Sequence, residues 1–338
     1  MAGAVTGLLL LRRWRRRART IDLAGARVLI GGGSRGLGLV LARELGARGA
    51  RVALCARDAG ELTRAREDLL ARGITAHTLT CDLTDRQAVG DMVDRVVAQL
   101  RGLDVLVNNA GLIQVGPLDA LTVEDFETAM ATNFWSAVYT TLAAVPVMRR
   151  RGGGRIVNIT SIGGRVSVPH LLPYSASKFA FVGLSLGLRA ELRREGILVT
   201  TVVPGLMRTG SPRNATFKGQ HRAEHAWFAI SDSLPGLSMS AERAARAIVA
   251  ALRHGAPYVV LSAPAKAAAL AGALTPGVTA ELLAVVNRLL PGPGGRGTCP
   301  ARGAESESAL APSWLTALSD AAARRNNQVE PAREASRA

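Results

Sequence analysis

The sequence contains little cysteine and few aromatic residues. Its three cysteines, Cys55, Cys81 and Cys299, are too few and too scattered in 338 residues for a disulfide framework or a metal site. Cys55 and Cys81 lie in or beside apolar, strand-like runs, so we expect them to be buried as small hydrophobic side chains. This usage predicts a reducing, intracellular compartment, a cytoplasmic protein that is not secreted, and no bound metal.

The sequence also lacks an apolar run that could cross a membrane. The N-terminal run at residues 8–11 has four leucines, whereas a span needs about 20 apolar residues. Six arginines follow this run, between residues 12 and 19, whereas a secretory signal carries its charge before the apolar run. We interpret residues 1–20 as a solvated apolar-basic arm, with peripheral contact to a membrane surface as the alternative.

Lysine is almost absent although the chain is strongly basic. Only three of the 42 basic residues are lysine, and the formal net charge is +16. A nucleic-acid binder that uses the basic arm is one interpretation of this charge. The sequence has no base-reading motif, and the excess of arginine, alanine and glycine is typical of a coding bias, so we expect no nucleic-acid partner.

Short apolar runs alternate with longer helical patterns through most of the chain. Continuous apolar strands separated by helices are typical of βαβ units and of a parallel sheet covered on both faces. We expect strands at residues 27–31, 51–55, 74–80, 103–107, 155–160, 197–203 and 258–261. The main helices are expected at residues 36–48, 61–72, 86–100, 123–149 and 175–195.

One domain, residues 21–262, is expected to contain this α/β pattern. The stretch that follows is rich in alanine and leucine and has a Pro276-Gly277 break, which predicts two helices and a linker over residues 263–297. Residues 298–338 are polar, so we expect a flexible tail with one short helix near residues 314–322.

A glycine-rich loop joins the first expected strand to the first expected helix. It reads Gly31-Gly32-Gly33-Ser34-Arg35-Gly36-Leu37-Gly38. Such a loop can cradle a diphosphate, because backbone N–H groups converge at a helix N-terminus and the helix dipole favours an anion there. Glycine permits the tight turn and the close approach of the ligand. The loop therefore predicts a dinucleotide site, with a glycine-rich turn that binds no ligand as the alternative.

The end of the second expected strand bears on the choice of cofactor. An NAD site of this kind usually has an acidic residue there, but this sequence has Arg57, and a second guanidinium lies in the loop at Arg35. Two guanidinium groups beside the adenosine ribose would bind a 2′-phosphate, which favours NADP(H) over NAD(H). An ordinary exposed arginine is the alternative interpretation of Arg57.

Two further strand ends carry polar residues. Asp82 could accept a hydrogen bond from the adenine amine or cap the next helix, although Thr84 or Asp85 is better placed as a cap. The run Asn108-Asn109-Ala110-Gly111 ends the fourth strand, and its amide side chains could join neighbouring strands and wall the adenine side.

The most specific signal is Tyr174 with Lys178. Residues four apart share one helix face, so the ammonium can lie beside the phenol. A free tyrosine has a pKa of about 10, and a nearby cation can lower it by about 1–3 units. The pair therefore predicts a phenol that is acidic enough for acid–base chemistry, with an exposed helical pair as the alternative.

Ser161 and Asn133 complete the candidate constellation. Ser161 follows the fifth strand, at the carboxyl end where ligands bind in such sheets, and its hydroxyl could hold a substrate oxygen toward Tyr174. Asn133 lies inside the long fourth helix, where asparagine is unfavourable. Its amide could distort the helix and hold a water for proton relay to Lys178, or the position could simply be solvated.

The order and spacing of five elements resemble the short-chain dehydrogenase/reductase family over about residues 21–262. The elements are Gly32-x-x-x-Gly36-x-Gly38, Asn108 to Gly111, Ser161, Tyr174 with Lys178, and Pro204 to Thr209. The resemblance implies an NAD(P)-dependent enzyme of the shorter reductase branch that acts on CH-OH groups. We expect a Rossmann-type doubly wound sheet with strand order 3-2-1-4-5-6-7 and a C-terminal helical extension.

Two features set this sequence apart within that family. Gly31 stands where the family usually has threonine, so a hydroxyl that braces the loop is missing. The N-terminal arm and the C-terminal extension are most similar to membrane-associated reductases related to dehydrogenase/reductase member 7B.

The resemblance also implies roles for individual residues. Tyr174 would be the acid–base, Lys178 its tuner and a ribose ligand, and Ser161 the ligand of the substrate oxygen. Asn133 would serve as the relay, and Thr209 would contact the nicotinamide amide or the diphosphate. The residues expected to bind NADP(H), or NAD(H) as the alternative cofactor, are Gly32, Ser34, Arg35, Gly36, Leu37, Gly38, Arg57, Asp82, Leu83, Asn109, Ala110, Gly111, Tyr174, Lys178, Pro204, Gly205 and Thr209.

Residues 204–235 are expected to form a lid over a small-molecule substrate. The aromatic residues Phe217, Trp227 and Phe228 predict an apolar carbonyl or alcohol, or they anchor the lid itself. A catalytically idle dinucleotide-binding sensor or scaffold is the second functional hypothesis. A homo-oligomer is expected by analogy with the fold.

Overall fold

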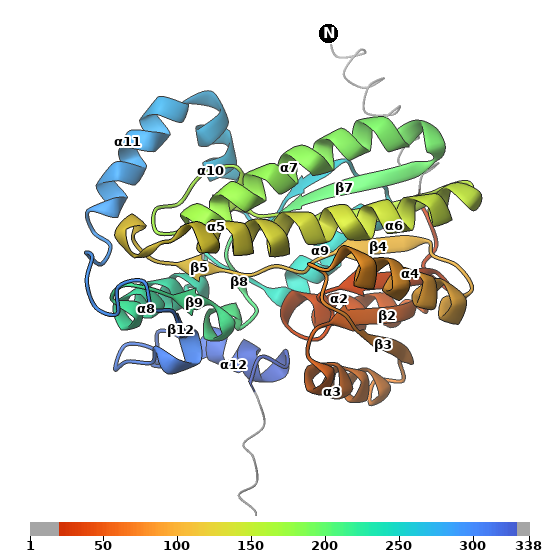
Figure 1. Cartoon of the computed structure of the whole chain (residues 1–338), viewed down its shortest axis with the longest axis horizontal. Helices are drawn as coiled ribbons and strands as arrows, with labels where there is room; N and C mark the ends of the chain where they lie inside the picture. Colours follow the sequence, from red (N-terminus) through yellow and green to blue (C-terminus); the bar gives the residue numbers. More distant parts are fainter. Residues whose placement is uncertain (1–19, 330–338) are drawn as a thin grey trace, which may run out of the picture.

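The computed structural model describes residues 20–329, and its centre is a seven-stranded sheet (Figure 1). The order is β11-β7-β6-β4-β1-β2-β3, and all neighbouring strands are parallel. The strands are β1 (Arg27–Gly31), β2 (Arg51–Ala56), β3 (Ala76–Thr80), β4 (Val105–Asn108), β6 (Gly154–Ile159), β7 (Ile197–Val203) and β11 (Tyr258–Val260). Counted along this sheet alone, the order is 3-2-1-4-5-6-7, so the predicted topology is confirmed. The arm at residues 1–19 lies outside the described residues.

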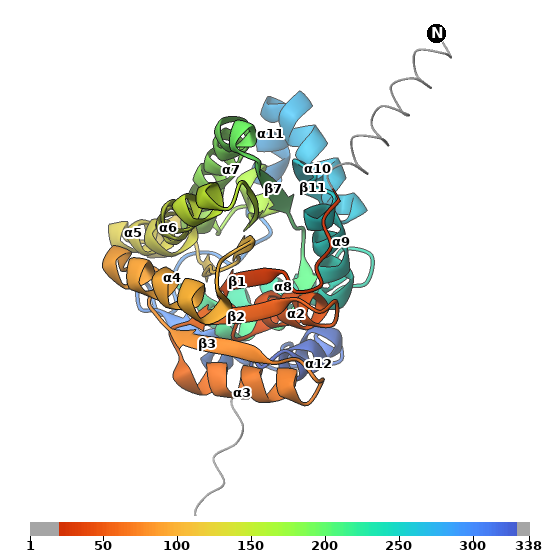
Figure 2. The ribbon, with the colours of Figure 1, turned by 90° about the vertical axis from the view of Figure 1, so that its right-hand side faces the viewer.

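Helices cover both faces of this sheet, as Figure 2 shows. One face packs against α2 (Gly36–Gly46), α3 (Ala59–Leu70) and α9 (Ala241–Arg253). The other packs against α4 (Arg86–Leu100), α6 (Ser136–Arg150) and α7 (Leu172–Leu192). Successive strand residues alternate between the faces: Ile30 and Leu54 join the first core, Leu29 and Ala53 the second. This double burial explains why the strands read as continuous apolar runs.

The helix expected over residues 123–149 is interrupted. A π-helical turn, η2 (Ala131–Trp135), separates α5 (Val123–Met130) from α6, and Asn133 lies at its centre. Oδ1 of Asn133 accepts a hydrogen bond from the Leu112 amide at 2.9 Å, and Nδ2 donates to the Leu112 carbonyl at 3.2 Å. The prediction of one continuous α-helix is therefore wrong, because this side chain ties a wider turn to the loop after β4.

Two small sheets accompany the main one. β5 (Gln114–Val115), β9 (Thr216–Phe217) and β12 (Ala301–Arg302) form the first, and β8 (Met207–Arg208) pairs with β10 (Met239–Ser240) in the second. The expected lid contains β8, β9, the turn η5 (Ser211–Asn214) and the helix α8 (His221–Ser233). Three more short turns are η1 (Leu118–Ala120), η3 (Ile162–Gly164) and η4 (Arg193–Glu195).

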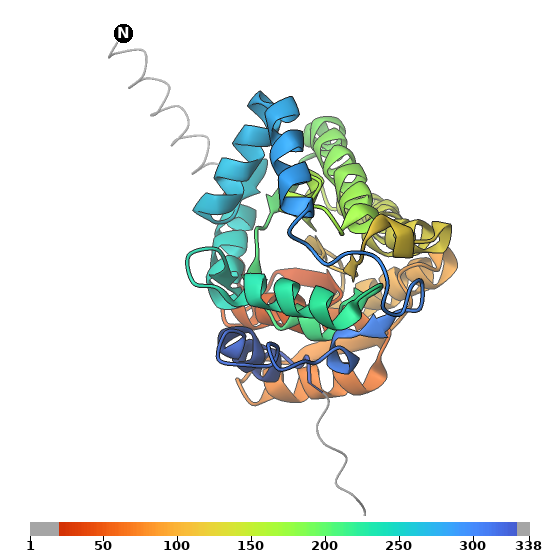
Figure 3. The ribbon, with the colours of Figure 1, turned by 90° about the vertical axis from the view of Figure 1, so that its left-hand side faces the viewer.

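The chain after β11 contains more structure than expected. α10 (Ala263–Leu274) and α11 (Pro276–Asn287) confirm the two predicted helices, and the pair projects from the body in Figures 1 and 3. Residues 298–329 were expected to be flexible, but they include β12, the turn η6 (Gly303–Glu305) and the helix α12 (Ala317–Arg325). The short helix expected near residues 314–322 is present as α12, whereas the expected flexibility is wrong for residues 298–329, because buried small side chains such as Ala322 and Ala323 let α12 pack on α8 and β8.

The cysteines differ in burial, and the helices differ in length and apolar content. Cys55 and Cys81 are buried, as expected, whereas Cys299 is exposed. Within the described part of the chain, no helix is both long and apolar enough to cross a membrane.

Candidate active site

Ser161, Tyr174 and Lys178 meet at the carboxyl end of β6. Ser161 caps η3 directly after that strand, and Tyr174 and Lys178 lie one turn apart in α7. Nζ of Lys178 is 5.8 Å from the centroid of the Tyr174 ring and donates to the Ile159 carbonyl at 3.2 Å. The predicted shared helix face is present, and the alternative of an exposed pair is wrong because Lys178 is only 4% exposed.

A glycine lets Ser161 and Tyr174 approach each other. The Gly163 amide donates to Oγ of Ser161 at 3.0 Å, which orients the hydroxyl. A Cβ on Gly163 would lie 3.0 Å from Cε1 of Tyr174 and 3.4 Å from Oγ of Ser161. A side chain at residue 163 would therefore crowd both groups, and glycine lets the Ser161 hydroxyl and the Tyr174 ring lie close together.

Burial dominates the acidity of the two titratable groups. It raises the pKa of Tyr174, an effect that the Ser161 hydrogen bond opposes and the charge of Asp232 reinforces. Burial also lowers the pKa of Lys178 to about 8. The expected acidified phenol is thus corrected in direction, because removal from water favours the neutral form of both groups. The raised pKa of Tyr174 favours the protonated phenol.

Asn133 lies beside this pair and is fully buried. Its Nδ2 donates to Oγ of Ser177 at 2.9 Å, next to Lys178 in α7. A Cβ on Gly111 would lie 2.9 Å from Oδ1 of Asn133 and 3.4 Å from Nζ of Lys178. The solvated alternative is therefore wrong. Its side-chain amide joins α7 and the turn η2 to the loop after β4.

The glycine-rich loop has the shape of a phosphate cradle. Gly32 and Gly36 have φ angles of +74° and +56°, a region that favours glycine. A Cβ on Gly38 would collide with the Gly32 carbonyl oxygen, so α2 can pack on the loop only if this position has no side chain. The residues present fit a diphosphate at the start of α2, where the helix dipole favours an anion.

Residues from the neighbouring strands brace this loop. Nδ2 of Asn109 donates to the Gly32 carbonyl at 2.8 Å. Cδ1 of Leu83 lies 3.1 Å from where a Cβ on Gly31 would be, so it fills space beside the residue that lacks the family's hydroxyl. Asn108 joins β4 to β6 through a buried hydrogen bond, as its sequence position suggested. Asn109 thus supplies part of the bracing that a threonine would give.

The two guanidinium groups expected at the ribose differ in environment. Nη1 of Arg35 donates to Glu61 at 2.9 Å, and Oγ of Ser34 donates to the same carboxylate at 2.7 Å. Arg57 is exposed after β2. Sequence reasoning missed Glu61, which reads as an ordinary acidic residue in the first turn of α3, three residues after the Asp58 cap. A phosphate bound to Arg35 would compete with the Glu61 carboxylate for the hydrogen bonds of the guanidinium group.

Asp82 forms a local turn after β3. Its Oδ1 accepts hydrogen bonds from the Thr84 amide at 2.9 Å and the Thr84 hydroxyl at 2.8 Å. Burial acts to raise the pKa of Asp82, but these hydrogen bonds and the charge of Arg57 hold it below the usual value. Asp85 caps α4, as expected, so capping that helix does not explain Asp82.

The loop after β7 faces the glycine-rich loop. The Pro204 carbonyl accepts a hydrogen bond from the Ile162 amide at 2.7 Å. Gly205 lies against the start of α10. Thr209 is buried, and its Cβ is 4.0 Å from where a Cβ on Gly36 would be. Thr209 is therefore across the cradle from the start of α2, where contact with a diphosphate would require it.

The lid aromatics form a small core against the site. Phe217 and Phe228 are buried, with ring centroids 6.0 Å apart, so they anchor the lid. Trp227 and Tyr174 are partly buried against the same cluster. The anchoring role that the sequence left open is thus present for two of the three aromatic residues.

A buried carboxylate connects the lid to the loop before α7. Glu224 is completely buried, lies 2.8 Å from Nδ1 of His170 and accepts a hydrogen bond from Nε1 of Trp227 at 2.7 Å. Sequence reasoning missed this contact because His170 and Glu224 are far apart in the chain and neither belongs to a motif. The contact holds α8 over the loop that leads to Tyr174.

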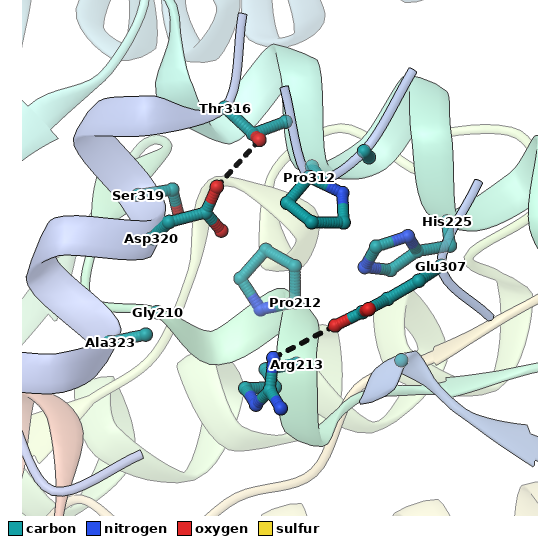
Figure 4. A pocket seen from close by; sticks show the side chains of 13 residues that line it. Gly210, Pro212, Arg213, His225, Glu307, Pro312, Thr316, Ser319, Asp320 and Ala323 are labelled. Atoms are coloured by element: carbon teal, nitrogen blue, oxygen red, sulfur yellow. Dashed lines mark hydrogen bonds and ion pairs between the residues drawn. The ribbon is translucent and has the colours of Figure 1, made fainter. Parts of the chain in front are cut away.

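A separate pocket lies between the lid and the C-terminal segment. Figure 4 shows Pro212 and Pro312 lining it, with the hydrogen bond from Thr316 to Asp320 at one side. Neither Ser161 nor any other member of the candidate constellation lines this pocket. It is therefore distinct from the candidate active site.

The strand order, the glycine cradle and the Ser161, Tyr174 and Lys178 cluster together define an NAD(P)-dependent oxidoreductase of the doubly wound α/β class. Comparison with known proteins gives the particular family. The chain belongs to the short-chain dehydrogenase/reductase family, since the family described as short chain dehydrogenase matches residues 26–218.

Individual relatives agree with this assignment. Gluconate 5-dehydrogenase of Gluconobacter oxydans is 36% identical over 188 residues, which cover 56% of this chain and 73% of that protein. Dehydrogenase/reductase SDR family member 7B of Bos taurus is 33% identical over 264 residues, 76% of this chain and 80% of that protein. The crystal structure of a gluconate 5-dehydrogenase from Burkholderia cenocepacia in complex with NADP and tartrate superimposes with a TM-score of 0.63. It is 26% identical and covers 72% of this chain and 96% of its own.

Proposed function

We propose that the protein interconverts a carbonyl group and a secondary alcohol with NADP(H), and that Tyr174 is the acid–base. The observation that supports this most is the packing of Ser161 and Lys178 around the phenol, with Nζ 5.8 Å from the ring centroid. The raised pKa of Tyr174 leaves a protonated phenol, which suits donation of a proton to a carbonyl oxygen.

Each residue of the cluster has a separate task in this proposal. When bound, the reduced nicotinamide supplies the hydride for the carbonyl carbon. Ser161 holds the carbonyl oxygen, and Tyr174 donates its proton to that oxygen. Lys178 stabilises the phenolate that remains, because an ammonium lowers the cost of a nearby negative charge. Asn133 keeps the loop after β4 against Lys178, and a proton relay through this position is part of the proposal.

We propose NADP(H) rather than NAD(H) as the preferred cofactor. No acidic residue ends β2, and the exposed Arg57 is free of the ion pair that engages Arg35. Arginine forms charge-assisted hydrogen bonds with phosphate that are stronger than those between neutral groups. The related gluconate 5-dehydrogenase structure was determined with NADP, which supports the same choice.

The surroundings of the phenol support an apolar substrate. Ile113, Val168, Leu171 and Trp227 belong to the apolar cluster that includes Tyr174. A substrate carbonyl within reach of Tyr174 would therefore have an apolar wall beside it, which favours ketones with apolar substituents. Relatives named gluconate 5-dehydrogenase make sugar acids the natural comparison in a substrate panel.

The assembly of the protein is a further part of the proposal. We take residues 21–262 as the catalytic unit and propose that it forms a homo-oligomer through its long helices. Large apolar side chains exposed on α6 and α7, Leu142, Phe179 and Leu186, support this contact. Light scattering of a Phe179→Asp/Leu186→Asp variant should report a smaller particle than the parent protein.

Peripheral membrane contact through residues 1–20 is also proposed, on the strength of the leucine and arginine content of that arm. Sedimentation with anionic vesicles, compared between the full chain and a chain lacking residues 1–19, tests it. Equal sedimentation of the two chains would count against the arm.

The experiment that tests the proposed function is an NADPH-oxidation screen across apolar and polar ketones with Tyr174→Phe. The variant should lose about 10²–10⁴ in kcat, the usual worth of a general acid, while it still binds NADPH. Tyr258→Phe, the same change at the first residue of the edge strand β11, is the matched control. Equal turnover by Tyr174→Phe would refute the acid–base role. Binding of NADPH without turnover of any ketone by the parent protein would favour the sensor hypothesis.

A further inference from the structure

The segment that follows α12 lies on the glycine-rich loop. The Asn326 carbonyl accepts a hydrogen bond from the Gly36 amide at 2.8 Å. Nδ2 of Asn327 donates to the Ser34 carbonyl at 2.9 Å and to the Glu61 carbonyl at 3.0 Å. We call residues 326–328 the tail plug. Its contacts reach both the first residue of α2 and the start of α3.

Gln328 fills the space between the loop and the lid. Its Nε2 lies 2.6 Å from where a Cβ on Gly36 would be, and Thr209 lies 4.0 Å from the same point. Oε1 of Gln328 accepts a hydrogen bond from Nδ2 of Asn214, a residue of η5, at 2.6 Å. The tail plug therefore occupies the gap between Gly36 and Thr209, where a diphosphate on this cradle would be expected.

Two arginines fasten the tail plug to the same two helices. Arg43 of α2 donates to Oδ1 of Asn326 at 3.1 Å and to the Arg325 carbonyl at 2.8 Å. Arg64 of α3 donates to Oδ1 of Asn327 at 2.8 Å. The segment is thus held by a set of specific polar contacts, and its position does not depend on a single bond.

We propose that the tail plug competes with the dinucleotide and must leave the start of α2 before the cofactor can bind. This inference rests on the proposed function. The first amide groups of a helix need an acceptor, and the Asn326 carbonyl satisfies one of them as a neutral oxygen. A diphosphate is a stronger acceptor at the positive end of the helix dipole, so the cofactor can replace the plug. The Gln328 side chain and a diphosphate cannot share the same gap.

The competition has a defined consequence for affinity. The apparent Kd of a ligand rises in proportion as the fraction of molecules in the competent state falls. Loosening the tail plug should therefore tighten NADPH binding. The plug has no hydrogen bond to Ser161, Tyr174 or Lys178 among the described contacts, so kcat at saturating cofactor should not change.

The first test is the variant Asn327→Ala/Gln328→Ala in the full chain. It removes four side-chain hydrogen bonds of the tail plug. Fluorescence titration should give a Kd for NADPH about tenfold lower than in the parent protein. Leu318→Ala, at an exposed side chain of α12, is the matched control and should leave the Kd unchanged.

The outcomes separate this inference from the proposed function. If the Kd for NADPH in the double variant is equal to or higher than in the parent protein, the proposed competition is wrong, while the proposed cofactor site is unaffected. Absence of NADPH binding in the parent protein, the double variant and the control overturns the cofactor site itself, and the competition with it.

A second test uses the unaltered protein. NADPH should speed amide hydrogen exchange in residues 322–328, where the Asn326 and Gln328 amides donate to the Ala322 and Ala323 carbonyls at 2.9 Å. It should slow exchange in residues 31–38. Slower or unchanged exchange in residues 322–328 while the loop becomes protected would show that plug and cofactor coexist, which contradicts the inference.

Discussion

The buried ion pair between Lys218 and Asp125 gives a quantitative test of what holds the lid. Nζ of Lys218 is 2.6 Å from Oδ2 of Asp125, and the two side chains are only 7% and 8% exposed. Asp125 also accepts hydrogen bonds from Nε2 of Gln114 at 3.0 Å and from the Thr122 amide at 2.8 Å. Lys218 follows β9 and Asp125 belongs to α5, so the pair joins the lid to a helix that packs on α7.

Lys218→Met should destabilise the protein by about 3–5 kcal/mol, because it leaves a buried carboxylate without its cation. Arg213→Met is the matched control. Its pair with Glu307 is 40% and 43% exposed, and an exposed pair contributes at most about 1 kcal/mol. An unfolding entropy of roughly 2.1 cal/mol/K per residue gives about 0.7 kcal/mol/K for 338 residues. The expected fall in Tm is therefore about 4–7 °C for Lys218→Met and below about 2 °C for the control.

Differential scanning calorimetry of the parent protein and both variants measures these shifts. Asp125→Leu/Lys218→Met should recover part of the loss, because replacing both charges removes the unpaired carboxylate. The reasoning holds that burial determines how much this ion pair contributes to the free energy of unfolding. It would be refuted if Lys218→Met lowered that free energy by less than about 1 kcal/mol, or by no more than Arg213→Met does.

Three further outcomes are expected. Gly38→Ala should abolish NADPH binding in a fluorescence titration, because its Cβ would collide with the Gly32 carbonyl oxygen; retained affinity would contradict the cradle. Burial raises the pKa of Asp232 from 3.8 to about 7, so between these values the folded protein holds a proton that the unfolded chain has lost. Stability should therefore fall as the pH rises through this range, and Asp232→Asn should reduce that slope in thermal scans; an unchanged slope would exclude this group as its source. Arg57→Ala should raise the Kd for NADPH about tenfold or more and leave that for NADH unchanged, whereas equal losses would count against 2′-phosphate recognition.

Much of the fold could be predicted because burial on both faces leaves a simple pattern. β1 and β7 begin and end at the predicted residues, since most positions of such a strand are apolar. The meeting of Ser161 with Tyr174 and Lys178 was predictable for a related reason: the carboxyl ends of parallel strands share one edge of the sheet.

Polar contacts between distant segments were not predictable in the same way. Glu61 looks like a helix-capping neighbour, yet it engages Ser34 and Arg35. The tail plug belongs to a stretch whose composition is typical of a flexible tail, and its partners on α2, α3 and η5 hold it in place. The sequence predicted a lowered pKa for Tyr174, and this direction was wrong. The spacing of the two residues indicates that Lys178 lies nearby, but it does not indicate that both groups are buried.

The measurement that tests the central claim most directly is the pH dependence of alcohol oxidation, with an alcohol related to a ketone found in the screen. The rate in the parent protein should rise as the Tyr174 phenol ionises. Lys178→Met should move the apparent pKa of this rise upward by about 1–3 units, because a phenolate and an ammonium stabilise each other, so ionisation of Tyr174 itself favours the charged form of Lys178 in the parent protein. Superimposable profiles in the two proteins would contradict the account.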